Sequence, residues 1–146
     1  MNLGLLGAGL VMGIAAIGSA IGIGAAGSAT IGAWKKCYVG NKPAPMTLLA
    51  FAGAPLTQTF YGYILMGQMI KAAEINIEYG WLYIGFGLAS GFAMAFSAIV
   101  QGKAGAAAAD AQAETGKGFA QYIAVVGIAE TVALFAMVLT MISLQA

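Results

Sequence analysis

The sequence lacks histidine and arginine, and only 8% of its 146 residues carry a charge. A net charge of +1 gives no sign of a nucleic-acid partner. A single cysteine excludes an internal disulfide, and Cys37 lies beside Lys35 and Lys36, so we expect a free surface thiol there. Hydrophobic residues make up 61% of the chain, which is typical of membrane proteins and leaves no room for a soluble domain.

The few charged residues gather in three clusters that separate long uncharged stretches. These clusters are Lys35–Lys42, Lys71–Glu78 and Lys103–Lys117, and Glu130 is the only charge after them. A bilayer core is crossed by a helix of about 20 mainly apolar residues. We therefore predict an all-α membrane protein with four transmembrane helices, at roughly residues 4–34, 46–72, 80–104 and 118–144. The first stretch lacks a basic leading segment and is too long for a signal peptide.

The placement of lysine indicates how the chain is oriented. The loop after the first helix carries three lysines and no acid, the loop after the second is acidic on balance, and the loop after the third carries two lysines and two acids. Positively charged loops stay on the cytoplasmic side. We expect a multi-pass protein of the cell membrane with these two loops in the cytoplasm and both termini outside.

Two segments of the first half recur in the second half. The segment SAIGIGAAG (Ser19–Gly27) aligns with SAIVQGKAG (Ser97–Gly105), and PLTQTFYGYILMGQMI (Pro55–Ile70) aligns with GIAETVALFAMVLTMI (Gly127–Ile142). The chain is therefore predicted to consist of two tandem helical hairpins, residues 1–74 and 75–146. Both hairpins would enter from the same side, unlike the inverted repeats of many transporters.

The first and third predicted helices are rich in glycine, while the second and fourth are bulkier. Three pairs have GxxxG spacing: Gly9/Gly13, Gly18/Gly22 and Gly87/Gly91. In lipid, small faces of this kind bring helix backbones close together. Two arrangements fit the pattern, a closed ring of hairpins with the small helices inside and a compact four-helix monomer with a glycine-rich core.

Glu130 lies in the last apolar span, with no other charge between Gly118 and Ala146. A charged acid at the centre of a membrane helix costs about 2.5–3.5 kcal/mol on insertion scales. The only basic residues within the four spans, Lys71 and Lys103, lie at the ends of their spans, so an ion pair at the depth of Glu130 is not available. Glu130 is then either protonated or bound to a cation, with a purely structural hydrogen bond as the third interpretation.

Other polar residues are predicted to lie near this carboxylate. The repeat aligns Gln58 with Glu130, and we predict a small polar set in the membrane interior: Thr57, Gln58, Tyr61, Gln101, Glu130 and Thr131. A hard cation prefers carboxylate, amide and hydroxyl oxygens, which Glu130, Gln58, Gln101 and Thr57 supply. Pro55 also removes a backbone donor, which by helix geometry would free the carbonyl of Phe51. One carboxylate balances one positive charge, so a monovalent ion is favoured.

With these residues in place, the chain resembles the membrane rotor proteolipid of V-type and A-type rotary ATPases, which is their K or c subunit. The resemblance covers essentially the whole chain. The motifs that carry it are PLTQTFYG (Pro55–Gly62), AIVQGKAGAA (Ala98–Ala107) and AETVAL (Ala129–Leu134). Together they are similar to the sodium-translocating branch, although Ala129 stands where that branch has valine and PLTQ replaces its PGTQ.

The resemblance implies a set of Na⁺ ligands and a set of partners. The ligands would be Glu130, Gln58, Gln101, the Thr57 hydroxyl and the backbone carbonyl of Ala54, with Tyr61 orienting Glu130. Identical subunits would form a ring in the lipid bilayer, turned by the central shaft of a soluble ATPase head against a stator subunit with an essential arginine. The chain would be a non-catalytic subunit of an ATP-hydrolysing complex and would need no organic cofactor.

The expected function is thus to carry one Na⁺ per four-helix subunit on Glu130 during ATP-driven rotation. The first alternative is the same rotor subunit carrying H⁺. A small proton-coupled multidrug antiporter is less favoured, because its acid lies among aromatic residues in the first helix, and here that helix has no acid. A purely structural glycine-zipper oligomer would leave Glu130 without a purpose.

Overall fold

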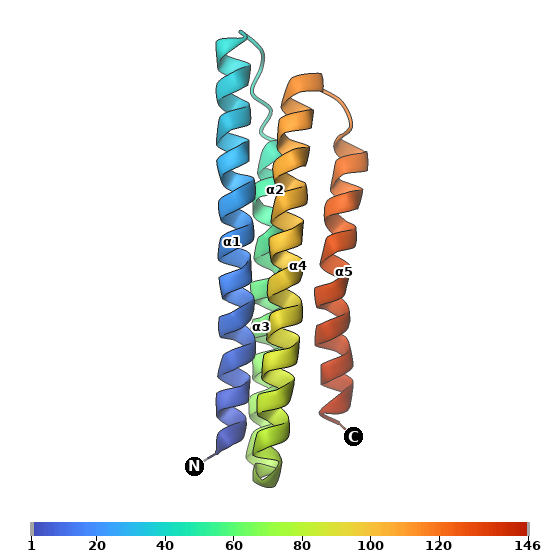
Figure 1. Cartoon of the computed structure of the whole chain (residues 1–146). Coiled ribbons are helices and arrows are strands. Elements are labelled where there is room, and N and C mark those ends of the chain that lie inside the picture. Colours follow the sequence, from blue (N-terminus) through green and yellow to red (C-terminus); the bar gives the residue numbers. More distant parts are fainter. Residues whose placement is uncertain (1, 146) are drawn as a thin grey trace.

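The computed structural model describes residues 2–145, and over that range it contains helices and short connections but no strand (Figure 1). This confirms the prediction of an all-α protein. In chain order the elements are α1 (Leu3–Val39), α2 (Leu48–Gly53), η1 (Ala54–Leu56), α3 (Thr57–Ile75), η2 (Ile77–Tyr79), α4 (Gly80–Thr115) and α5 (Phe119–Ser143).

Three helical segments are long and apolar enough to cross a membrane: Leu3–Val39, Ile77–Thr115 and Phe119–Ser143. They contain most of the first, third and fourth predicted spans. At 1.5 Å per residue, the 37 residues of α1 extend for about 55 Å, well beyond the ~30 Å of a hydrocarbon core. These helices continue past the charges that bound the predicted spans. The end of α4, for example, is set by Gly116, whose φ of 66° stops the helix in the left-handed region.

The second predicted span, residues 46–72, is helical but interrupted. Pro55 lies in the 3₁₀ turn η1, which separates the short helix α2 from α3. This interruption follows from the missing N–H and the fixed φ of proline. α3 also carries Gln58, Gln68, Lys71 and Glu74, and it is not among the segments that meet the length and apolarity of a membrane span. The second membrane span, the tandem hairpins and the ring therefore stay predictions.

α1 and α4 lie side by side and run in the same direction (Figure 1). Their backbones approach closely where glycines meet: a Cβ atom on Gly102 would lie 2.3 Å from the carbonyl oxygen of Gly22. The predicted pairs Gly18/Gly22 and Gly87/Gly91 both lie in this interface. Gly9 and Gly13 differ, because a Cβ atom on either would meet no atom within 4 Å. Small residues thus join the two halves of the chain along most of its length.

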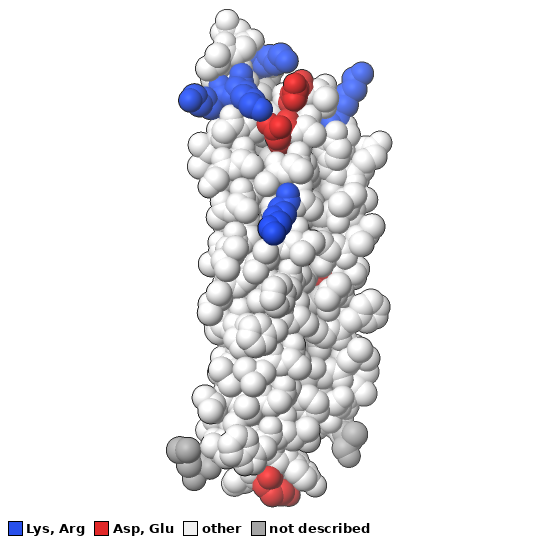
Figure 2. Space-filling view, viewed as in Figure 1, with Lys and Arg blue, Asp and Glu red and all other residues white. Residues whose placement is uncertain are grey.

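The charged side chains gather at the ends of the bundle, and the flank between them is mostly uncharged (Figure 2). The ends of α1 and α4 lie at one end, where Lys36 Nζ and Asp110 Oδ1 form an exposed ion pair at 2.6 Å. The N- and C-terminal ends of the chain lie at the opposite end (Figure 1). The two lysine-bearing loops therefore share one end of the molecule, and their cytoplasmic location stays a prediction.

The thiol of Cys37 is free, as predicted, but the predicted surface position is wrong. Its side chain is only 2% exposed, and its Sγ lies 3.9 Å from the carbonyl oxygen of Ala113 near the end of α4. The neighbouring lysines suggest a surface position, but successive residues of a helix point in different directions. Cys37 lies on the side of α1 that packs against α4, where a small apolar residue is suited to a close contact.

The buried side chains form two apolar clusters along the long axis. The cluster near the lysine-bearing end includes Ala33, Leu48, Phe51, Ala109 and Val126. The cluster toward the termini includes Val11, Leu65, Met69, Met94 and Ala133. The buried polar side chains of Gln58, Ser97 and Gln101 lie between them in sequence on the same helices. The polar residues of interest are thus enclosed by apolar packing on both sides.

Candidate ion-binding site

Glu130 of α5 is half-buried, and both of its carboxylate oxygens accept hydrogen bonds from other helices. The hydroxyl of Tyr61 on α3 donates to Oε1. Nε2 of Gln101 on α4 donates to Oε2 at 3.2 Å. Hydrogen bonds to an ionised carboxylate are among the stronger ones in proteins. Three helices therefore fix the position of this one acid.

Two carboxamide side chains are completely buried beside the carboxylate. Gln58 and Gln101 are both 0% exposed, and Gln58 Nε2 donates to Gln101 Oε1 at 2.8 Å. Gln101 Nε2 also donates to the carbonyl oxygen of Val126 at 3.1 Å. A buried amide without partners costs free energy, and here both nitrogens are satisfied. The two glutamines form a continuous polar bridge from α3 through α4 to α5.

The turn at Pro55 places a hydroxyl and a carbonyl beside this bridge. Thr57 Oγ1 donates to the carbonyl oxygen of Ala54 at 3.0 Å and lies 3.2 Å from Gln58 Oε1. The carbonyl of Phe51 packs elsewhere, because a Cβ atom on Gly105 of α4 would lie 2.7 Å from its oxygen. The geometry therefore favours Ala54 over Phe51 as the backbone oxygen nearest the polar set.

These groups offer oxygen atoms of several kinds around one negative charge. An amide oxygen has two lone pairs. Oε1 of Gln101 accepts one hydrogen bond from Gln58 Nε2, and Oε1 of Gln58 lies beside the Thr57 hydroxyl, whose single hydrogen is directed to Ala54. A lone pair thus remains on each for a cation. Together with Glu130, Thr57 and Ala54 they form the oxygen set that hard cations prefer. A single carboxylate matches the charge of a monovalent ion.

One residue of the predicted polar set lies outside this arrangement. Thr131 is exposed, and its hydroxyl donates to the carbonyl oxygen of Ile128 in its own helix at 2.7 Å. Threonine commonly makes this bond within a helix. Thr131 therefore takes no part in the network around its neighbour Glu130.

One member of the network is absent from the predicted set. Ser97 is only 5% exposed, and its Oγ contacts both Gln58 on α3 and the backbone of α5. The signal that could have found it is spacing, because Ser97 lies one helical turn before Gln101 and so shares its face. No pattern in the sequence indicates the carbonyl groups of Val126 and Ala129 as partners.

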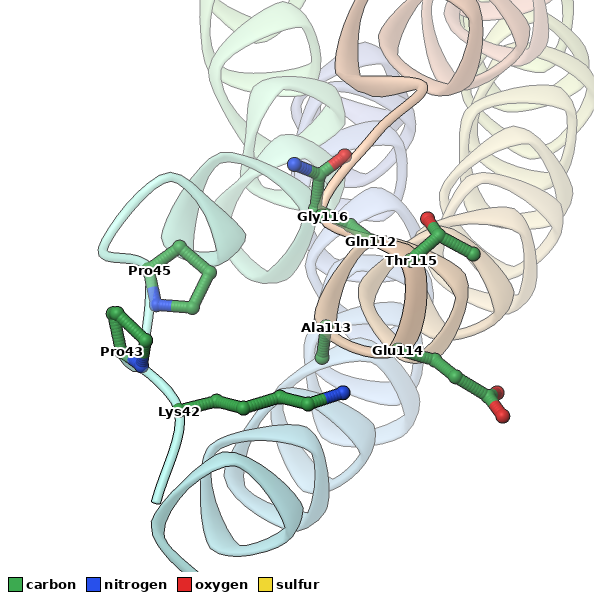
Figure 3. Close-up of a pocket in the computed structure, with 8 residues that line it drawn as sticks. All are labelled: Lys42, Pro43, Pro45, Gln112, Ala113, Glu114, Thr115 and Gly116. Carbon is green, nitrogen blue, oxygen red and sulfur yellow. The ribbon is translucent and has the colours of Figure 1, made fainter. Parts of the chain in front are cut away.

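A hollow at the lysine-bearing end is separate from this network. Its volume is about 420 Å³, and it lies between the loop that follows α1 and the end of α4 (Figure 3). Lys42 runs along it, whereas Glu114 points away from it (Figure 3). The residues around it are Lys42, Pro43, Pro45, Gln112, Ala113, Glu114, Thr115 and Gly116. Glu130 and its hydrogen-bond partners are not among them, so the hollow is not part of the candidate site.

Comparison with protein families gives a match to part of the chain, and no curated protein matches it. Residues 84–143 match the family of the ATP synthase C subunit. The matched segment contains most of α4 and all of α5, and with them Ser97, Gln101 and Glu130. The matched segment is less than half of the chain, so the match shows similarity to this family over α4 and α5.

Proposed function

We propose that this chain is the rotor-ring subunit of a sodium-translocating V-type ATPase and carries one Na⁺ on Glu130 during ATP-driven rotation. The observation that carries the proposal is that polar side chains from α3 and α4 surround the carboxylate of Glu130. Tyr61 and Gln101 hold its two carboxylate oxygens, and Gln58 and Thr57 add neutral oxygens beside it. Such a set is suited to a desolvated monovalent cation.

Rotation in lipid explains why the carboxylate needs a partner throughout the cycle. An uncompensated charge facing hydrocarbon costs several kcal/mol, so Glu130 stays neutralised by an ion while it faces the bilayer. At the stator, the essential arginine would take the place of the ion and let it leave into one half-channel. A new ion would enter from the other. Moving one charge across 100 mV requires about 2.3 kcal/mol, which ATP hydrolysis in the soluble head would supply.

The choice of Na⁺ over H⁺ is based on the neighbours of the carboxylate. A proton needs only the carboxylate oxygen, whereas Na⁺ needs several oxygen ligands to replace its water. Gln58 and Gln101 are fully buried, and each keeps a lone pair for a cation, which a proton carrier would not need. H⁺ remains the alternative ion for the same rotor subunit. An antiporter is disfavoured, since α1 carries no acid.

The direction of transport is inferred from the position that aligns with Glu130 in the first hairpin. That position holds Gln58, so each four-helix subunit carries one ion where two single hairpins could carry two. Fewer ions per rotation leave more free energy for each ion, which suits a pump. We therefore propose ATP-driven export of Na⁺ as the working direction.

The experiment that tests this function is ATP-driven ²²Na⁺ uptake by inverted membrane vesicles that contain the whole complex. Glu130→Gln keeps the size of the side chain but removes its charge and replaces one of its two acceptor oxygens by a donor, and uptake should fall to background. Glu74→Gln makes the same change at an exposed acid of α3 and should leave uptake unchanged. Uptake at the parental rate by a ring made only of Glu130→Gln subunits would reject the proposal.

A further inference from the structure

Ser97 lies where α3, α4 and α5 meet, and it contacts the candidate site without touching the carboxylate. Its Oγ lies 2.7 Å from the carbonyl oxygen of Ala129 and 3.2 Å from Gln58 Nε2. We propose that Ser97 is a positioning residue that keeps the amide oxygen of Gln58, rather than its nitrogen, directed toward the ion. This inference deepens the proposed function and rests on it.

The hydroxyl of Ser97 has a single hydrogen to donate. A backbone carbonyl only accepts, so Ser97 must donate its hydrogen to Ala129. The oxygen of Ser97 then has only lone pairs to offer to Gln58. It is suited to the N–H of the Gln58 amide and unsuited to its carbonyl oxygen.

The second contact of the Gln58 amide has the same polarity. Gln101 Nε2 donates to the Val126 carbonyl at 3.1 Å and to Glu130 Oε2 at 3.2 Å, and both of these oxygens are acceptors. Oxygen Oε1 of Gln101 therefore faces Gln58 and accepts from its Nε2 at 2.8 Å. Both N–H groups of Gln58 thus donate to oxygen atoms, Ser97 Oγ and Gln101 Oε1, that act only as acceptors toward Gln58.

A rotation of the Gln58 amide by 180° would reverse these contacts. Its oxygen would face the lone pairs of Ser97 and Gln101, and two hydrogen bonds would become repulsive contacts. Its nitrogen would face Thr57 and the cation, and an N–H group repels a cation. The Ser97 hydroxyl therefore selects the orientation of Gln58 in which Oε1 is available for Na⁺.

The counterpart of Ser97 in the first half provides a matched control. Ser19 aligns with Ser97 and is 2% exposed, but its hydroxyl has no hydrogen-bond partner within residues 2–145. Ser90 is a second control on α4 itself, because its hydroxyl bonds Thr140 Oγ1 at 2.7 Å, outside the network around Glu130. Removing either hydroxyl tests the loss of a buried serine without touching Gln58.

The test measures how much Na⁺ protects Glu130 from a hydrophobic carbodiimide in membranes that contain the full-length chain. Ser97→Ala should raise the Na⁺ concentration for half-protection about fivefold, the effect of losing one neutral hydrogen bond. The labelling rate without Na⁺ should stay within about twofold, as a proton needs only the carboxylate. Ser19→Ala and Ser90→Ala should leave both quantities within the same limit. Ser97→Thr keeps the hydroxyl and should behave as the parent.

A double-mutant cycle separates positioning from a general structural effect. Gln58→Leu should weaken protection by itself, and adding Ser97→Ala to it should then change protection less than about twofold. Unchanged protection in Ser97→Ala, an equal loss in Ser97→Thr, or additive effects with Gln58→Leu would each overturn the inference. If the parent itself shows no Na⁺ protection, the proposed sodium site fails, and the role of Ser97 in it fails as well.

Discussion

The hydroxyl of Tyr61 on α3 donates to the carboxylate of Glu130 on α5, although 69 residues separate them in the sequence. Tyr61 lies three residues after Gln58, so both side chains project from the same face of α3. One face of α3 thus provides both the hydroxyl that donates to Glu130 and the Gln58 amide of the candidate site. Because this face begins directly after the turn at Pro55, the proline fixes where the set starts along the bundle.

Tyr61→Phe should weaken Na⁺ binding while the chain still folds, because the ring is kept and only the hydrogen bond to Glu130 is lost. A hydrogen bond to a charged group contributes about 1.5–3 kcal/mol, so we expect affinity to fall at least tenfold. ²²Na⁺ binding to the purified protein measures this. Tyr63→Phe, at an exposed position of the same helix, is the control and should bind as the parent does. Equal affinities in the two variants would contradict the role of Tyr61.

Gln101→Ala and Thr57→Ala should each weaken Na⁺ transport more than H⁺ transport. Each removes a neutral oxygen from a desolvated cation, whereas a proton still has the carboxylate. Transport by the reconstituted complex, measured with Na⁺ present and absent, gives both quantities. Thr131→Ala removes an exposed hydroxyl beside Glu130 and should change neither. If both site variants keep parental Na⁺ transport, these side chains are not ligands.

Gly102→Ala should destabilise the packing of α1 on α4. The added Cβ atom would lie 2.3 Å from the carbonyl oxygen of Gly22, so the two helices would have to separate. Overpacking of this kind costs about 1–3 kcal/mol. Thermal unfolding in detergent should show a lower midpoint, whereas Gly85→Ala, which meets no atom within 4 Å, should not. A parental midpoint for Gly102→Ala would show that this contact is not as close as described.

The sequence was sufficient for the main components of the site. The isolated carboxylate at Glu130 and the repeat that aligns it with Gln58 both follow from patterns along the chain. Tyr61 also follows Gln58 by three residues, a spacing that is typical of one helix face. The structure brings Glu130, Gln58, Gln101, Thr57 and Tyr61 together as these patterns suggest.

Burial and backbone partners could not be read from the sequence in the same way. Ser97 and Thr131 are both hydroxyl residues near the site, yet one is 5% exposed and bridges three helices while the other faces outward. Which hydroxyl is buried depends on how α4 and α5 pack, and no local pattern encodes it. The same reason explains Cys37, whose charged neighbours concealed its position against α4.

Helix ends were also misplaced where charge was used to locate them. The first charge after an apolar stretch shows where a hydrocarbon span ends, but a helix ends where its hydrogen bonding ends. α4 therefore continues from Lys103 to Thr115 and stops at Gly116. At Pro55 the helix is interrupted inside an uncharged stretch, so the distribution of charge gives no sign of the interruption.

The most direct test of the account is the competition between Na⁺ and a hydrophobic carbodiimide for Glu130. The reagent attacks a protonated carboxyl in an apolar environment, so the exposed acids Glu74, Glu78, Asp110 and Glu114 should remain unlabelled. We predict labelling at Glu130 alone, suppressed by Na⁺ and much less by K⁺. Because Na⁺ and H⁺ would compete for one carboxylate, less Na⁺ should be needed for protection as the pH rises. Labelling of Glu130 that ignores Na⁺ at every pH would contradict the account and identify the carried ion as H⁺.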